Sequence, residues 1–145
     1  MRADMAAVLR KDHEGMAPAL DRLREIADAL DDAEGAPAVS LISEANEIVA
    51  ERIVRHERDD EASVYPKLVK FLADGHGLGA MSRAHREIIH LARLLGQLSV
   101  GLYAKDADRY LIRDAQRVME SIEALVRMHN AQEEDIYEHA TASSD

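Results

Sequence analysis

Residues 111–137, LIRDAQRVMESIEALVRMHNAQEEDIY, are the stretch that decides the fold of this chain. Apolar residues recur here three and four positions apart, which is the period of an amphipathic helix. The residues on this face are Leu111, Ala115, Val118, Ile122, Leu125, His129, Glu133 and Ile136. A histidine and a glutamate four residues apart therefore continue an otherwise apolar stripe. The stretch predicts a long helix that buries an imidazole and a carboxylate.

Three other segments have the same period, and breaks rich in glycine or aspartate separate them. We expect helices over residues 3–30, 38–72, 80–102 and 106–140, with Pro66 kinking or ending the second one. No segment alternates with the period of two that predicts a strand. Ala, Leu, Ile and Met dominate the apolar residues, which favours helices packed on helices. The 145 residues are therefore expected to form a single all-α domain, 1–145.

The composition excludes several classes of function. The chain has no cysteine, so it has no disulfide, thiolate metal site or cysteine nucleophile. Its net charge of −10 argues against nucleic acid or an anionic membrane as a partner. The first twenty residues contain no apolar run long enough for a signal peptide or a membrane span. A cytoplasmic protein is the expectation, and the sequence identifies no protein partner.

Each of the other three apolar stripes also holds one histidine, namely His13, His56 and His85, and the second adds Asp60 four residues after His56. The His-x3-acid spacing thus occurs twice, and it places both side chains on one helix face. Buried carboxylates are costly unless they are paired or bind a metal, and the stripes carry no Lys or Arg. Two such pairs on facing helices predict a binuclear metal site. The remaining histidines are expected outside it: His76, His90 and His139.

This order of motifs resembles the hemerythrin-like, or HHE cation-binding, family. The resemblance covers nearly the whole chain and includes Asp12-His13-Glu14, Ala84-His85-Arg86 and the two His-x3-acid motifs. It implies an up-and-down four-helix bundle around two iron ions, an oxo- or hydroxo-bridged centre. The carboxylates at 60 and 133 would bridge the ions, and the histidines would cap them.

Oxygen-carrying hemerythrins have two histidines four residues apart on the third helix, whereas here Met81 and Ile89 stand four residues either side of His85. The chain therefore resembles the four-histidine branch of this family more than the oxygen carriers. In that branch the acid after the second-helix histidine, here Glu57, is also a ligand. Position 60 is Asp where the family usually has Glu, so Glu61 competes with Asp60 for the bridging role. The metal ligands that we expect are His13, His56, Glu57, Asp60, His85, His129 and Glu133.

Iron is favoured over zinc, because a site of imidazoles and carboxylates with more than four ligands suits a six-coordinate redox metal. The ferritin-type Glu-x-x-His spacing occurs only at Glu87 and His90, on a polar face. The expected function is binding iron and reacting with or sensing oxygen, another small diatomic molecule or a peroxide. Alternatives are an enzyme for peroxide, nitric oxide or iron-centre repair, an iron storage or sensing module, and a metal-free scaffold. Motif spacing does not separate them, and whether the chain is an enzyme stays open.

Overall fold

The computed structural model describes residues 2–71 and 77–142, and the described chain consists of four long helical rods with short connections. The first, third and fourth rods are α1 (Arg2–Ala29), α5 (Leu78–Ser99) and α6 (Arg109–Ala142). Short 3-10 turns follow α1 (η1, Leu30–Asp32) and precede α6 (η5, Ala104–Asp106). The described residues include no strand. The expected all-α class and the four helices are confirmed, with ends shifted by a few residues.

The second rod is helical throughout but changes its winding several times. It consists of α2 (Gly35–Ile48), the π-helix η2 (Val49–Val54), α3 (Arg55–Asp59), the π-helix η3 (Asp60–Val64), α4 (Tyr65–Leu68) and the 3-10 turn η4 (Val69–Phe71). Pro66 stands in the first turn of α4, directly after η3. In an α-helix a proline lacks the N–H for one hydrogen bond, and its ring collides with the preceding turn. The wider π-helical turn before Pro66 leaves room for the ring, so the rod continues through Pro66.

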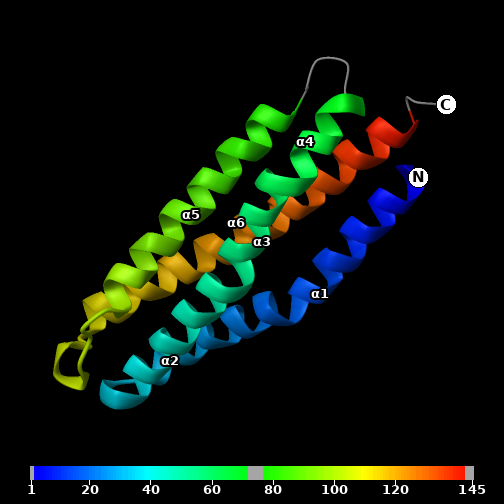
Figure 1. The fold of residues 1–145 in the computed structure, drawn as a ribbon. Helices are drawn as coiled ribbons and strands as arrows, with labels where there is room; N and C mark the ends of the chain where they lie inside the picture. The colour runs from blue at the N-terminus through cyan, green and yellow to red at the C-terminus, as the bar shows by residue number, and fades with distance from the viewer. Residues whose placement is uncertain (1, 72–76, 143–145) are drawn as a thin grey trace.

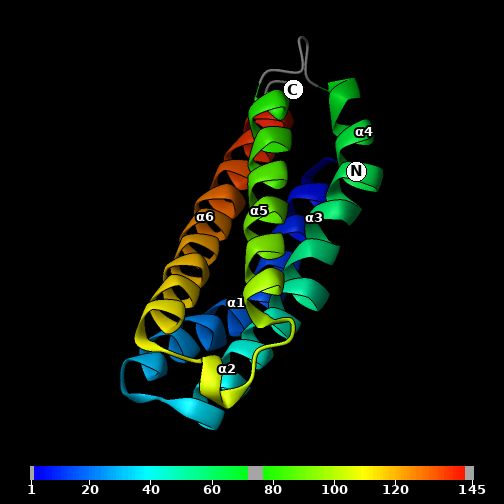
Figure 2. The ribbon, with the colours of Figure 1, turned by 90° about the vertical axis from the view of Figure 1, so that its left-hand side faces the viewer.

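The four rods lie side by side as an up-and-down bundle (Figures 1 and 2). α6 packs against α1 and α5, and α2 packs against the same two helices. Both ends of the described chain lie at the end of the bundle where α4 finishes and α5 begins. None of the described helices combines the length and apolar character needed to cross a membrane.

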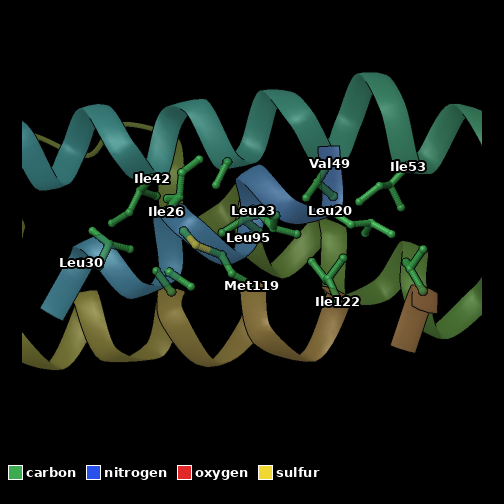
Figure 3. Close-up of a cluster of buried hydrophobic side chains, with 14 of the residues drawn as sticks. Leu20, Leu23, Ile26, Leu30, Ile42, Val49, Ile53, Leu95, Met119 and Ile122 are labelled. Atoms are coloured by element: carbon green, nitrogen blue, oxygen red, sulfur yellow. The ribbon is translucent and has the colours of Figure 1, made fainter. Parts of the chain in front are cut away.

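Two apolar clusters fill the interior, and the titratable residues form a layer between them. The larger cluster, shown in Figure 3, includes Leu23, Leu95 and Met119. The smaller one lies nearer the chain ends. On α1, Leu9 belongs to the smaller cluster and Met16 to the larger, with His13 between them. The expected ligands on the other three rods separate the same two clusters. The bundle thus places the expected ligands at one level between two apolar blocks.

Gly77 sets the start of α5 at one side of this layer. Its φ is 89°, in the left-handed region that favours glycine. A Cβ there would lie 3.0 Å from Cδ1 of Ile136 on α6. Glycine therefore lets the beginning of α5 pack closely on α6, on the chain-end side of the metal-ligand candidates.

Candidate metal centre

The structure brings together all seven residues that the sequence singled out. His13 comes from α1, His85 from α5 and His129 from α6, and each is buried. His56 is half-buried on α3. The carboxylates are Glu57 on α3, Asp60 at the start of η3 and Glu133 on α6, with exposed fractions of 0%, 4% and 1%. An apolar interior that holds three carboxylates needs a source of positive charge.

Their ligand atoms fall into three overlapping groups, in each of which all atoms lie within 4.8 Å of one another. The groups are Glu57, His85, His129 and Glu133; His13, His56 and Glu133; and His56, Glu57, Asp60 and Glu133. Glu133 belongs to all three. Among the described residues, Asp60 belongs to only one group, and that group contains neither His85 nor His129. Asp60 thus lies on the His56 side of the cluster, whereas Glu133 lies between the His56 side and the side of His85 and His129.

The closest contacts in the cluster join histidine nitrogens to carboxylate oxygens. His129 Nε2 lies 2.6 Å from Glu133 Oε1 and 3.2 Å from Glu57 Oε2. His85 Nε2 lies 2.8 Å from Glu57 Oε2. The Nε2 atoms of these two histidines therefore face the same carboxylate from two neighbouring helices, α5 and α6.

Several buried atoms of the cluster make no hydrogen bond of good geometry within the described protein, although some of them lie within ion-pair distance of one another. They are Nε2 of His13 and His56, both ring nitrogens of His129, both carboxylate oxygens of Glu57 and Glu133, and Oδ2 of Asp60. A buried carboxylate oxygen without a donor is costly, and a cation bound between such atoms removes that cost. The donor set contains imidazole nitrogen and carboxylate oxygen without sulfur, which suits iron, manganese or zinc. The residues present therefore fit a bound metal.

Two further glutamates hold the outer nitrogens of two histidines. Glu134 Oε1 lies 3.0 Å from Nδ1 of His13, and Glu61 Oε1 lies 3.0 Å from Nδ1 of His85. A carboxylate that accepts from Nδ1–H fixes the tautomer and turns Nε2 towards the centre. Glu61 is 40% exposed at its side chain, outside the cluster that contains Asp60. Of the two acids left open by the sequence, Asp60 therefore lies inside and Glu61 orients His85.

These orienting acids occupy equivalent places in the two motifs, and sequence reasoning did not assign them this role. Glu61 follows His56 by five residues, and Glu134 follows His129 by five. Each acts on a histidine of a rod that lacks the motif. The doubled acid after both histidines was the available signal.

Two tyrosines close the cluster on the side of the smaller apolar cluster. Tyr65 is buried, its ring stacks on His85 with centroids 4.9 Å apart, and its hydroxyl lies 3.1 Å from His85 Nε2. Tyr137 on α6 is also buried. Burial and the nearby carboxylates raise the pKa of both phenols, so both remain neutral. They are the tyrosines that follow the two motifs in the sequence.

The π-helical winding of the second rod explains why Glu57 faces inward. Buried residues follow at steps of four along Ala45, Val49, Ile53 and Glu57. In an α-helix each such step would overshoot by about 40°. The wider turns of η2 (Val49–Val54) offset this drift, so the steps stay on one face. The inner face thus runs through Glu57, and His56 lies at its edge.

The charges within the cluster shift one another's pKa. Burial acts to raise the pKa of Glu57, but His129 and His85 outweigh it and lower that pKa to about 2. Burial acts to lower the pKa of His129, but Glu133 and Glu57 raise it to about 9. Burial also raises the pKa of Glu133. Without a metal ion, a protonated His129 therefore balances part of the negative charge.

The histidines that were expected outside the site lie outside it wherever the structure describes them. His90 on α5 and His139 on α6 are exposed. His76 lies outside the described residues.

One protein family accounts for the chain as a whole. The family model for the hemerythrin HHE cation binding domain matches residues 4–140. No curated protein and no solved structure shows significant similarity to the chain.

Proposed function

Because the chain belongs to the hemerythrin HHE cation-binding family, we propose that it is a non-haem di-iron protein that reacts with or senses oxygen or a related small oxidant. The observation that carries the proposal is the convergence of four histidines and three carboxylates, with Glu133 common to all three groups. A carboxylate shared between groups is the arrangement that a pair of neighbouring ions requires.

The groups suggest two metal positions. Glu57, His85, His129 and Glu133 would hold the first ion, since their ligand atoms converge and all are at most 1% exposed. His13, His56 and Glu133 would hold the second, with Asp60 as a further ligand beside His56. Glu133 would bridge, and Glu57 is the second carboxylate that the groups share. Asp60 would then be a terminal ligand, whereas the family resemblance implied a bridging role.

Iron is the metal that we propose for this set of imidazoles and carboxylates. When bound, the iron pair would supply reversible one-electron redox steps. The protein's own residues would exclude bulk water through the two apolar clusters and hold each histidine in position. Tyr65 would keep a neutral hydroxyl next to the first position, available as a hydrogen-bond donor.

Reaction with an oxidant is favoured over reversible carriage of oxygen by the carboxylate content of the site. Hard carboxylate ligands favour the oxidised, harder state of iron. Three of the seven proposed ligands are carboxylates, and all three are almost fully buried. Peroxide consumption, nitric oxide handling, iron-centre repair and iron storage or sensing use the same ligands and are the alternatives.

The test is optical and Mössbauer spectroscopy of protein loaded anaerobically with two equivalents of ferrous iron and then exposed to air or peroxide. We expect rapid conversion to a coupled diferric spectrum that degassing does not reverse. The matched control is a His129→Ala variant, which removes one proposed ligand. An adduct that reverses on degassing would instead identify an oxygen carrier. Spectra of two unrelated mononuclear ions would contradict the di-iron proposal.

A further inference from the structure

A cavity of about 310 Å³ lies beside the proposed second metal position. Its walls come from three rods: α1 supplies Val8 and Leu9, the second rod supplies Val64, and α6 supplies Tyr137. Asp60 also lines it, so the cavity reaches a carboxylate of the metal-ligand cluster. It therefore reaches the edge of the candidate centre at Asp60.

The cavity is much larger than a diatomic ligand needs. A water molecule occupies about 30 Å³ in the liquid, so the cavity corresponds to roughly ten such volumes. Pockets for organic ligands begin at about 300 Å³. Its size is therefore that of a site for a small organic molecule, such as a substituted benzene.

The lining defines the chemistry of such a molecule. Val8, Leu9 and Val64 present aliphatic side chains, and Val8 is 59% exposed at the mouth, so the body of the ligand should be apolar. A carboxylate such as Asp60 accepts hydrogen bonds and does not donate, so the head group must be a donor. An anionic head would be repelled by Asp60.

The charges that line the rest of the cavity favour a neutral ligand. Asp12 and Lys67 both line it, and their opposite charges offset each other. An ammonium head would lose its hydration in an otherwise apolar space, which is costly for a charged group. A hydroxyl head costs far less to desolvate and still donates to Asp60.

We propose that this cavity binds a small neutral organic molecule with an apolar body and a hydroxyl-type head, an alcohol, phenol or hydroperoxide, with the head at Asp60. The proposal deepens the proposed function and rests on it, since it makes the molecule a neighbour of the metal centre. Binding itself needs only the cavity and is measurable without metal.

The experiment uses four probes that share one body: cumyl alcohol, cumene hydroperoxide, cumene and cumylamine. Calorimetry and ligand-detected NMR would measure the binding of these probes to chelator-treated protein and to iron-loaded protein kept anaerobic. The hydroperoxide would be measured with chelator-treated protein only. We expect the alcohol and the hydroperoxide to bind about tenfold more tightly than cumene, because each can donate a hydrogen bond to a carboxylate. The tighter of the two identifies the preferred head group. Tightest binding of the amine, or equal binding of all four probes, would overturn the proposal.

Two variants test the location. Val64→Phe and Val8→Phe place a ring in the cavity, and each should weaken cumyl alcohol binding about tenfold or more. Val8 is exposed, so Val8→Phe keeps the test valid if Val64→Phe disturbs folding. Val69→Phe is the matched control, since Val69 is an exposed valine of the second rod outside the cavity lining. Equal binding in Val8→Phe and Val69→Phe would overturn the location.

Metal uptake is measured on the same samples. Iron uptake without probe binding would overturn this inference and leave the proposed function standing. Probe binding without iron uptake would overturn the proposed function and leave the cavity as a ligand site.

Discussion

Replacing Glu133 by glutamine is the perturbation with the largest expected effect, because this residue belongs to all three ligand groups. The amide preserves volume but is a poor bridging ligand, so Glu133→Gln should weaken both metal positions. A ligand present at about 100 times its Kd stabilises the folded state by about 2.7 kcal/mol. Two iron ions bound independently at that excess would therefore stabilise the folded protein by about 5 kcal/mol. At about 2–4 °C per kcal/mol for a chain of this size, iron should raise the Tm of the unaltered protein by about 10–20 °C. In Glu133→Gln this gap should shrink to a few degrees.

Without metal, Glu133→Gln should not destabilise the protein. Burial raises the pKa of Glu133 above its ordinary value. A carboxyl group with a raised folded-state pKa destabilises the fold once the pH exceeds its unfolded-state pKa, and this cost grows until the folded-state pKa is passed. At neutral pH the glutamine removes the cost, although it also loses the contact with His129. We therefore expect chelator-treated Glu133→Gln to melt no lower than the chelator-treated parent.

The assay is thermal unfolding of chelator-treated and iron-loaded samples at one pH, with elemental analysis of each. In Asp60→Asn the difference in Tm between iron-loaded and chelator-treated protein should shrink only in part, because Asp60 belongs to only one of the ligand groups among the described residues. Glu138→Gln, at an exposed position of the same helix, is the control and should keep the whole gap. Full iron content and an undiminished gap in Glu133→Gln would refute the reasoning.

Three further predictions concern individual residues. Glu57→Gln should remove the ion held with His129, whereas Glu61→Gln should lower iron affinity only about tenfold by freeing the His85 ring; equal losses in isothermal titrations would contradict these roles. The double variant His90→Gln and His139→Gln should take up as much iron as the parent, since both side chains are exposed, and a loss would show that the site lies elsewhere. Ferrous iron affinity should rise by up to about tenfold per pH unit from neutral pH to about 9, because the metal must displace a proton from His129. The chelator-treated protein should become less stable over the same interval. The raised pKa of His129 stabilises the folded state fully at a pH below the pKa of an unfolded histidine, and this stabilisation is lost as the pH rises through the folded-state pKa. Flat pH profiles of both quantities would contradict the protonated state of His129.

The fold and the composition of the site were predictable because three of the four rods have regular α-helical winding. On α1 His13 is buried, as expected of a residue on the apolar stripe. On α6 His129 and Glu133 are buried, as are the predicted Ala115 and Ile122. The predicted Val118 and Leu125 are only half-buried, and their neighbours Met119 and Val126 are buried instead. Adjacent residues of a helix point about 100° apart. Because both residues at these places are apolar, the sequence does not show which of the two faces the core.

The second rod could not be predicted in the same detail, because its winding depends on tertiary packing. Steps of four residues suggest drift across a helix face unless π-helical turns are known to be present. The spacing therefore favoured His56 as the inner residue, whereas the structure buries Glu57 more deeply. The sequence also suggested that no cation faces the buried carboxylates. A protonated His129 supplies one, and its raised pKa depends on contacts between separate helices.

The stoichiometry of iron tests the central claim most directly. Chelator-treated protein is loaded anaerobically with excess ferrous iron, freed of unbound metal and measured for iron and protein in the same sample. The overlapping groups around Glu133 predict close to two irons per chain. A saturated value close to one would contradict the binuclear centre, whatever the affinity of that single ion.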